Sequence, residues 1–268
     1  MQTSSRSFRL FVPLSAALAL CAGTRAFDAG PLDPMKPVID AWSKVRLQAQ
    51  QLEVTLNRAE GKTAAEFSFA APAGAGEAYV PWVLFHENAK AEQVKAFAGP
   101  KELTPVPHLL KAPAKVPPRK PGDPDFSRPK VPSDAERRGE QLRSCLDANQ
   151  GFTLSDSDHN WFAYPVDFKA GAETKVRVEA ALQPYPLADS TAGPCRAYRI
   201  PLRLGNFFAP PPGKIQAAIT LGEDLSPDDV LLVRPANLKR EGRTFSLQIE
   251  NESPLEDLVV VIKDRPAK

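Results

Sequence analysis

Apolar and charged residues alternate along most of the C-terminal half of the chain, a pattern typical of β-strands that bury one face. Val176, Val178 and Ala180, for example, alternate with charged residues. The same pattern predicts strands at Trp161–Phe168, Lys175–Leu182, Tyr198–Leu204, Ile215–Leu221, Val230–Val233, Phe245–Ile249 and Leu258–Ile262. Short antiparallel strands in this number and spacing predict an immunoglobulin-like β-sandwich, although the Cys-Trp-Cys pattern of an antibody domain is missing.

A second group of strands is predicted before this region, within residues 43–105. Val45, Leu47 and Ala49 alternate in one phase, and the apolar residues from Leu52 to Leu56 alternate in the opposite phase. A phase change of one residue requires a β-bulge or a break, because a slip of one residue turns every side chain to the other face. Further strands are predicted around Phe67-Ser68-Phe69 and Val80–Leu84, with a hairpin at Gly99-Pro100. We expect a small β-sandwich that leans on the second half of the chain, because about 60 residues make a thin core.

One helix is predicted, at residues 134–148. Ser133 and Glu136 have the spacing of a capping box, in which each side chain binds a backbone N–H of the other residue. Leu142, Cys145 and Leu146 follow at helical spacing and share one face.

Residues 105–132 contain nine prolines, which excludes a regular helix or strand ladder and predicts an extended spacer. The predicted organisation is therefore a signal peptide at 1–26, a β domain at 27–104, a linker at 105–132, and a helix plus a second β domain at 133–268. The linker is rich in bases, among them Lys111, Arg119 and Lys120. Either it is a solvated spacer, or these bases contact an anionic envelope polymer or a partner protein.

The N-terminus has the three-part pattern of a secretory signal peptide. Arg6 and Arg9 precede an apolar stretch from Leu10 to Cys21, and cleavage is expected after Ala26. The alternatives are a membrane anchor, for which the stretch is too short, and a lipoprotein signal, for which Leu20 is unsuitable before the cysteine. The expectation is an exported protein, periplasmic or extracellular, with no transmembrane span in the mature chain.

Charge and cysteine content refine this expectation. The chain of 268 residues has a formal net charge of +2, and loss of residues 1–26 leaves 31 bases and 32 acids. This balance argues against a nucleic-acid partner held by a global basic charge. Cys145 and Cys195 remain in the mature chain, and in an exported protein a disulfide between them is the favoured interpretation. Two thiols or a redox pair are the alternatives.

No motif indicates catalysis, and no catalytic, metal or cofactor residue is predicted. The three histidines, His86, His108 and His159, are far apart in the sequence and lack zinc-site spacing. Residues 156–160 begin like a calcium loop, but Trp161 occupies the position where the sharp turn needs glycine. A polar turn before a strand is the alternative.

Phe207 and Phe208 are adjacent in a loop between two predicted strands. Two neighbouring aromatic side chains are not expected to face one core, so one of them is a candidate partner contact. The alternative is that one fills the core and the other packs on Pro210–Pro212. Trp42 and Trp82 are expected to pack in or at the rim of a core.

Several segments resemble an exported bacterial family of two β-domains whose function is unknown. The resemblance lies in Lys44–Leu47 leading to Phe67-Ser68-Phe69, in Trp161–Phe168 followed by Val176-Arg177-Val178, and in Tyr198–Ile219. It implies two β domains behind a signal peptide and no catalytic residues. The proline-rich linker departs from the family pattern.

The function expected from the sequence is a non-catalytic, exported β-sandwich protein. It would bind an unknown protein or envelope polymer, or help to assemble the envelope. The alternative is a carboxylate-based hydrolase that acts on an envelope polymer, which would need a pocket with converging polar groups.

Overall fold

The computed structural model describes residues 35–85, 90–107, 109, 132–150, 159–187 and 193–264. The chain from Pro34 to Lys268 clusters into one compact unit. The signal peptide, most of the proline-rich segment with Lys111, Arg119 and Lys120, and the histidines His86 and His108 lie outside the described residues.

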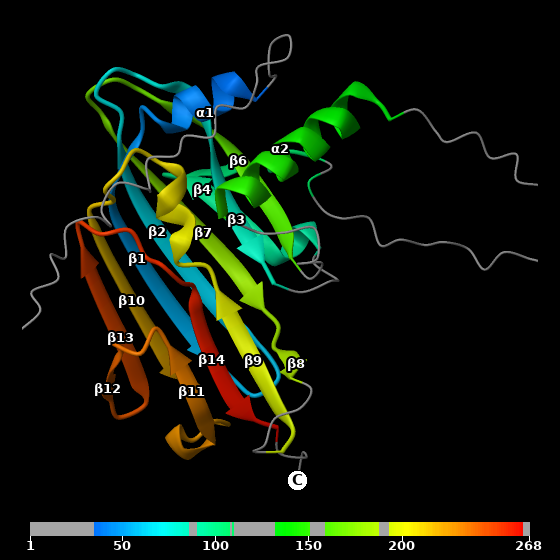
Figure 1. The fold of residues 1–268 in the computed structure, drawn as a ribbon, viewed down its shortest axis with the longest axis vertical. Helices are drawn as coiled ribbons and strands as arrows, with labels where there is room; N and C mark the ends of the chain where they lie inside the picture. The colour runs from blue at the N-terminus through cyan, green and yellow to red at the C-terminus, as the bar shows by residue number, and fades with distance from the viewer. Residues whose placement is uncertain are drawn as a thin grey trace, which may run out of the picture. The chain divides into compact units, whose positions relative to one another are not determined.

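A large mixed sheet forms one layer of the unit (Figure 1). Its eight strands lie in the order β12-β13-β10-β1-β2-β7-β4-β5. Their bounds in that order are Lys239–Glu241, Thr244–Glu250, Lys214–Leu221, Arg46–Leu56, Gly61–Ala70, Glu173–Leu182, Val94–Ala98 and Lys101–Leu103. All neighbours are antiparallel except β1 and β10, which are parallel.

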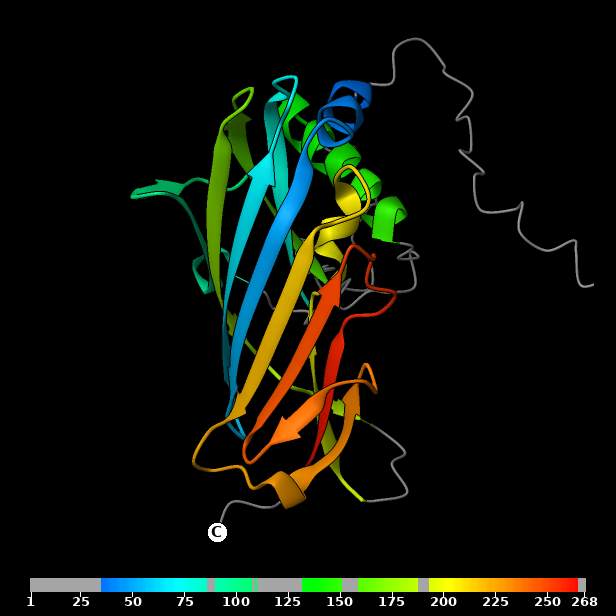
Figure 2. The same ribbon diagram turned by 90° about the vertical axis from the view of Figure 1, so that its left-hand side faces the viewer.

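Two smaller antiparallel sheets form the opposite layer (Figure 2). The four-stranded sheet has the order β11-β14-β9-β8, with bounds Val230–Arg234, Leu258–Lys263, Cys195–Ile200 and Tyr185–Leu187. The two-stranded sheet pairs β3 (Gly76–Leu84) with β6 (Asn160–Phe168). Buried side chains from all three sheets form one continuous hydrophobic core, so the prediction of a mainly β sandwich is confirmed.

The helices lie at one end of the sandwich, near the top of Figure 1. They are α1 (Lys36–Trp42) and α2 (Asp134–Gln150), with short 3-10 helices η1 (Ala91–Gln93), η2 (Arg203–Phe207) and η3 (Pro227–Asp229) elsewhere. The capping box of α2 is confirmed, because Ser133 N–H donates to Glu136 at 2.6 Å and Glu136 N–H donates to Ser133 Oγ at 3.2 Å. Leu142 and Leu146 are buried as predicted.

The division into two β domains differs from the structure. Strands from before and after the proline-rich segment pair within one sheet: β1 pairs with β10, and β2 and β4 both pair with β7. The described strands of residues 133–268 therefore do not form a separate immunoglobulin-like domain, because β1 and β2 of the first half lie between β10 and β7 in the large sheet. Buried side chains of both halves belong to one hydrophobic core, which agrees with the expectation that the N-terminal strands lean on the second half.

The bulge predicted in the first strand is confirmed. The pairing of β1 with β2 shifts register between Leu47 and Ala49. Beyond the shift, Leu52, Val54 and Leu56 face the core while the residues between them are exposed.

One predicted strand ends earlier than the sequence pattern indicates, and one helix was not predicted. The strand expected to reach Leu204 ends at Ile200, and η2 follows it. Leu202 and Leu204 are still buried, so their apolar spacing reports burial rather than extended backbone. The helix α1 was not predicted, and it buries Trp42, whose indole N–H donates to the carbonyl oxygen of Tyr79 at 2.7 Å.

Candidate functional site

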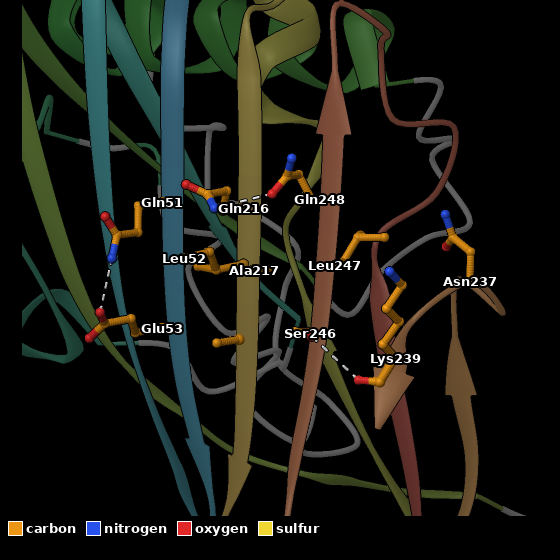
Figure 3. Close-up of a pocket in the computed structure, with 11 residues that line it drawn as sticks. Gln51, Leu52, Glu53, Gln216, Ala217, Asn237, Lys239, Ser246, Leu247 and Gln248 are labelled. Carbon is orange, nitrogen blue, oxygen red and sulfur yellow. Dashed lines mark hydrogen bonds between the residues drawn. The ribbon is translucent and has the colours of Figure 1, made fainter. Parts of the chain in front are cut away.

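The candidate site is a hollow on the outer face of the large sheet, over β1, β10 and β13 (Figure 3). It has a volume of about 640 Å³. The side chains that point outward into it come mainly from these three strands, and β12 and the turn before it close one side. The lining residues are Gln51, Leu52, Glu53, Gln216, Ala217, Ala218, Asn237, Lys239, Ser246, Leu247 and Gln248.

Strand alternation explains why these side chains are polar. Leu52, Ala217 and Leu247 face the core, so their neighbours on either side face the solvent. On β1 the outward residues are Gln51, Glu53 and Thr55, which are all exposed. The bulge at Leu47 sets this phase, because without it the glutamine and glutamate would point into the core.

The register of the strands places three glutamines in one row. Gln51 lies opposite Gln216 across the parallel pair, and Gln216 lies opposite Gln248 across the antiparallel pair. Gln216 Nε2 donates to Gln248 Oε1 at 3.4 Å, and Gln51 Nε2 donates to Glu53 Oε1 at 3.1 Å. These bonds orient the amides side by side along one edge of the hollow (Figure 3).

The next row forms the floor of the hollow. Glu53 lies opposite Ala218, Ala218 opposite Ser246, and Ser246 opposite Lys239. Alanine and serine are short, so the surface is low between the glutamate at one end and the lysine at the other. Chemically, the hollow offers amide and hydroxyl groups that both donate and accept hydrogen bonds, with one acid and one base at its ends.

Two other polar clusters hold elements together. Asp147 of α2 accepts hydrogen bonds at Oδ1 from Trp161 Nε1 at 2.6 Å and contacts His159 Nε2 at 2.8 Å. His159 is buried, and the pair connects α2 to the start of β6.

Asp257 forms the second cluster. Its buried carboxylate accepts from Arg199 Nε and Nη2 at 3.1 and 3.0 Å and from the backbone N–H of Leu202 at 3.2 Å. Arg203 also contacts it, and Arg203 Nη1 donates to the last carbonyl oxygen of α2, on Gln150, at 3.2 Å. A buried charge is costly unless hydrogen bonds and opposite charges surround it, so we assign this cluster a structural role.

Burial also shifts the pKa of several tyrosines. Burial raises the pKa of Tyr198, whose hydroxyl donates to the carbonyl oxygen of Asn57 at 2.7 Å. It also raises the pKa of Tyr164, whose hydroxyl donates to the carbonyl oxygen of Val94 at 3.1 Å. Both phenols connect strands to backbone elsewhere in the core, and neither lines the hollow.

The aromatic pair expected to supply a partner contact is buried, and that prediction is wrong. Phe207 packs against Trp42 at 5.2 Å and Trp161 at 5.8 Å between ring centroids, and Phe208 packs on Phe69 at 4.7 Å. The backbone changes from helical to extended between the two residues. Consecutive side chains therefore reach different parts of the same core.

The predicted disulfide is not formed in the structure. Cys195 begins β9, packs with Ala197 and Val261, and donates from Sγ to the carbonyl oxygen of Gly193 at 3.1 Å. Cys145 packs from α2 against the main core instead. The two thiols thus belong to separate clusters among the described residues, and no disulfide joins them.

Other sequence expectations have mixed outcomes. Trp42 and Trp82 are buried in the core, as expected. Residues 156–158 of the calcium-like segment lie outside the described residues, while His159 and Asn160 are buried. In the described part of the chain, no group of three or more His, Cys, Asp and Glu side chains could hold a metal ion, and no helix has the length and hydropathy for membrane crossing.

The hollow itself was missed, although the sequence contains its signal. Gln-x-Glu-x-Thr at 51–55 and Gln-x-Ala-x-Thr at 216–220 are parallel, and Thr-x-Ser-x-Gln at 244–248 is their reverse on an antiparallel strand. The polar positions of these strands hold mostly uncharged residues, unlike those of Lys175–Leu182.

Comparison with known proteins shows likeness at the level of the fold. No protein-family model and no curated protein matches the chain. A solved structure described as a "putative nutrient binding protein" from Legionella pneumophila is similar, with a TM-score of 0.50 and 11% identity over 83% of this chain and 68% of that one. An M1 zinc metallopeptidase from Deinococcus radiodurans has a TM-score of 0.35 and 10% identity, and this chain covers 45% of its length.

Proposed function

We propose that the protein is an exported, non-catalytic binding module, and that its ligand occupies the outer hollow. The observation that carries the proposal is the row of three glutamine side chains in register above a floor of short residues. Ligand sites are concave and contain a few polar groups that fix the ligand's orientation. The secretory pattern at 1–26 supports export, and the fold-level likeness to a protein described as nutrient binding is consistent with a binding role.

The polar groups of the hollow favour binding over hydrolysis. Hydrolysis of a glycosidic bond by carboxylates uses a pair of them on opposite sides of the bond. Glu53 is the single carboxylate among the described lining residues, and the Gln51 amide donates to it. Among the described lining residues, none supplies the second carboxylate that such a hydrolase needs.

The binding proposal can be tested by filling the hollow. Ala218→Trp places a large ring on its floor, whereas Ala181→Trp places the same ring on an exposed position of β7, on the outer face of the same sheet but away from the hollow. The secreted chain is screened against arrays of oligosaccharides, peptides and nutrient-sized molecules. We expect the bound probe to lose at least about tenfold in affinity with Ala218→Trp, which corresponds to about 1.4 kcal/mol, and to be unaffected by Ala181→Trp.

Three results would contradict the proposal. One is binding that survives Ala218→Trp, since the ligand would then lie elsewhere. Another is an array on which no probe of any class binds, and the third is turnover of the bound probe, because a released product would show an enzyme. Export is tested separately by N-terminal sequencing of the protein from the cell envelope and the medium, where a mature chain beginning at Phe27 is expected.

A further inference from the structure

Uncharged polar side chains continue beyond the hollow along the outer face of β1, β10 and β13. One row is Gln51, Gln216 and Gln248, and two residues along each strand the floor follows. Two residues further, Thr55, Thr220 and Thr244 form a third row, in which the hydroxyls of Thr220 and Thr244 are 3.5 Å apart. We define the glutamine row, the floor residues Ala218 and Ser246, and the threonine row as the neutral strip; Glu53, the floor residue on β1, is charged and is not part of it.

The strip contrasts with the other half of the same face. The outward residues of β7 are mostly charged, and β2 adds Lys62 and Glu66. Lys175 Nζ lies 3.8 Å from Glu66 Oε1, and Arg177 contacts Glu179. Amides and hydroxyls are ordinary exposed groups, but here they stand in register on three adjacent strands, whereas the outward positions of β7 are mostly charged.

The amides and hydroxyls of the strip favour a ligand that is rich in hydroxyl groups and has no charge. A primary amide has two N–H donors and a carbonyl acceptor, and a hydroxyl both donates and accepts. Gln51 Nε2 donates to Glu53, Gln216 Nε2 to Gln248, and Gln248 Nε2 to Glu250. Each amide therefore uses one of its N–H groups in a bond that fixes its orientation. The remaining donors and acceptors repeat at the spacing of neighbouring strands, about 4.8 Å, which is close to the length of one sugar ring in a linear chain.

We propose that the neutral strip binds a neutral polysaccharide, which lies across β1, β10 and β13 with about one sugar ring per strand. The inference rests on the proposed function and names its ligand class. The floor of Ala218 and Ser246 gives room for the rings, and the glutamine row supplies hydrogen bonds to their hydroxyls. Lys239 lies on β12, outside the three strands, and Glu53 on β1 is the one charged residue of the floor row that the chain would cross.

The test measures binding of defined oligosaccharides by isothermal titration calorimetry. Neutral linear glucans from a monosaccharide to a hexasaccharide are compared with an oligogalacturonate, which has a carboxylate on each ring, and with an uncharged peptide. A neutral glucan is expected to bind, with affinity that rises until the chain spans three strands. Its dissociation constant is expected to be the same at low and high salt, because no net charge is neutralised.

A matched pair of variants locates the contact. Gln216→Ala removes the central amide of the row and is expected to weaken glucan binding about fivefold to tenfold, the loss of one or two hydrogen bonds. Gln183→Ala removes an exposed glutamine between β7 and β8 and is expected to leave binding unchanged. Equal effects of the two variants would overturn the assignment to the strip.

The outcomes separate this inference from the proposed function. If the acidic oligosaccharide or the peptide binds in a manner sensitive to Ala218→Trp and the glucans do not, the hollow is a binding site and the neutral-polysaccharide inference is wrong. If no probe is sensitive to Ala218→Trp, both fail together. If a glucan binds and only Gln216→Ala and Ala218→Trp weaken it, both stand.

Discussion

At the scale of single residues, the buried tyrosines show how a polar group is accommodated in this core. Tyr198 is fully buried, and its hydroxyl donates to the carbonyl oxygen of Asn57. The group is tolerated because a backbone acceptor satisfies it. Ionisation would break that bond and leave a buried charge, so the raised pKa and the hydrogen bond have the same structural origin.

Tyr198 is therefore expected to make stability depend on alkaline pH. Its contribution is complete below the unfolded-state pKa of about 10 and is lost as the pH rises above that value, because the unfolded chain releases the proton first. Tyr198→Phe should lower the free energy of unfolding by about 1 kcal/mol at neutral pH and flatten the loss above pH 10. Urea denaturation across this pH range measures both effects. The prediction would be contradicted if the free energy of unfolding fell as steeply above about pH 10 in Tyr198→Phe as in the unsubstituted protein. It would also be contradicted if the double variant Tyr164→Phe/Tyr198→Phe showed that same steep fall.

At the scale of elements, α2 shows how a helix docks on a sandwich with few apolar residues. It buries Leu142 and Leu146. Polar contacts at its C-terminal part provide the other attachments to the sandwich. Asp147 binds the side chains of His159 and Trp161, and the end of the helix exchanges two hydrogen bonds with Arg203. The position of α2 thus depends on a carboxylate as much as on hydrophobic contact.

Removal of that carboxylate should loosen the helix. Asp147→Ala leaves two partly buried nitrogen donors without its oxygen, so we expect a loss of about 1–3 kcal/mol in the free energy of unfolding. Amide hydrogen exchange in α2 should become faster by more than that in β1. Glu140→Ala, on the exposed face of the same helix, is the control. A loss that Glu140→Ala reproduces would mean that helix propensity, rather than the contacts of Asp147, explains the effect.

At the scale of the whole unit, the large sheet makes the two halves of the chain interdependent. Strand β1 is bordered by β2 from its own half and by β10 from the other half. At the ends of the parallel pair, the N–H groups of Gly213 and Gly222 donate to the carbonyl oxygens of Leu47 and Leu56 at 2.8 and 2.7 Å. A Cβ on Gly213 would lie 1.9 Å from the Gln48 carbonyl oxygen, so this close approach requires glycine.

The shared sheet predicts one cooperative unfolding transition. If the halves were separate domains, each could unfold by itself, but here the loss of either half removes strands from the sheet of the other. Calorimetry of residues 27–268 should show a single peak with equal calorimetric and van't Hoff enthalpies. Two resolved transitions would contradict this prediction, because they would show that each half is stable by itself in spite of the pairing of β1 with β10.

The candidate site was only partly predictable from the sequence. Alternation identified the strands that contain Gln51, Gln216 and Gln248 and placed these residues on the polar side. It did not reveal that the three strands are neighbours, because β1 (Arg46–Leu56) and β10 (Lys214–Leu221) are far apart in the sequence although they pair in the sheet. The pattern instead points to Phe207 and Phe208, which are buried, because the spacing of two adjacent aromatic residues does not show that the backbone turns at the end of η2 and directs both into the core.

The sequence by itself determined what depends on near neighbours. Strand phase, the bulge in β1, the hairpin of β4 and β5, and the capped start of α2 all follow from residues a few positions apart, whose geometry the backbone imposes locally. Only the tertiary structure decided which strands pair, that one sheet joins both halves, that Cys145 and Cys195 lie in different clusters, and that three glutamines align. Those features depend on contacts between distant segments, and the order of strands in a sheet is set by the packing of the whole core rather than by any local pattern.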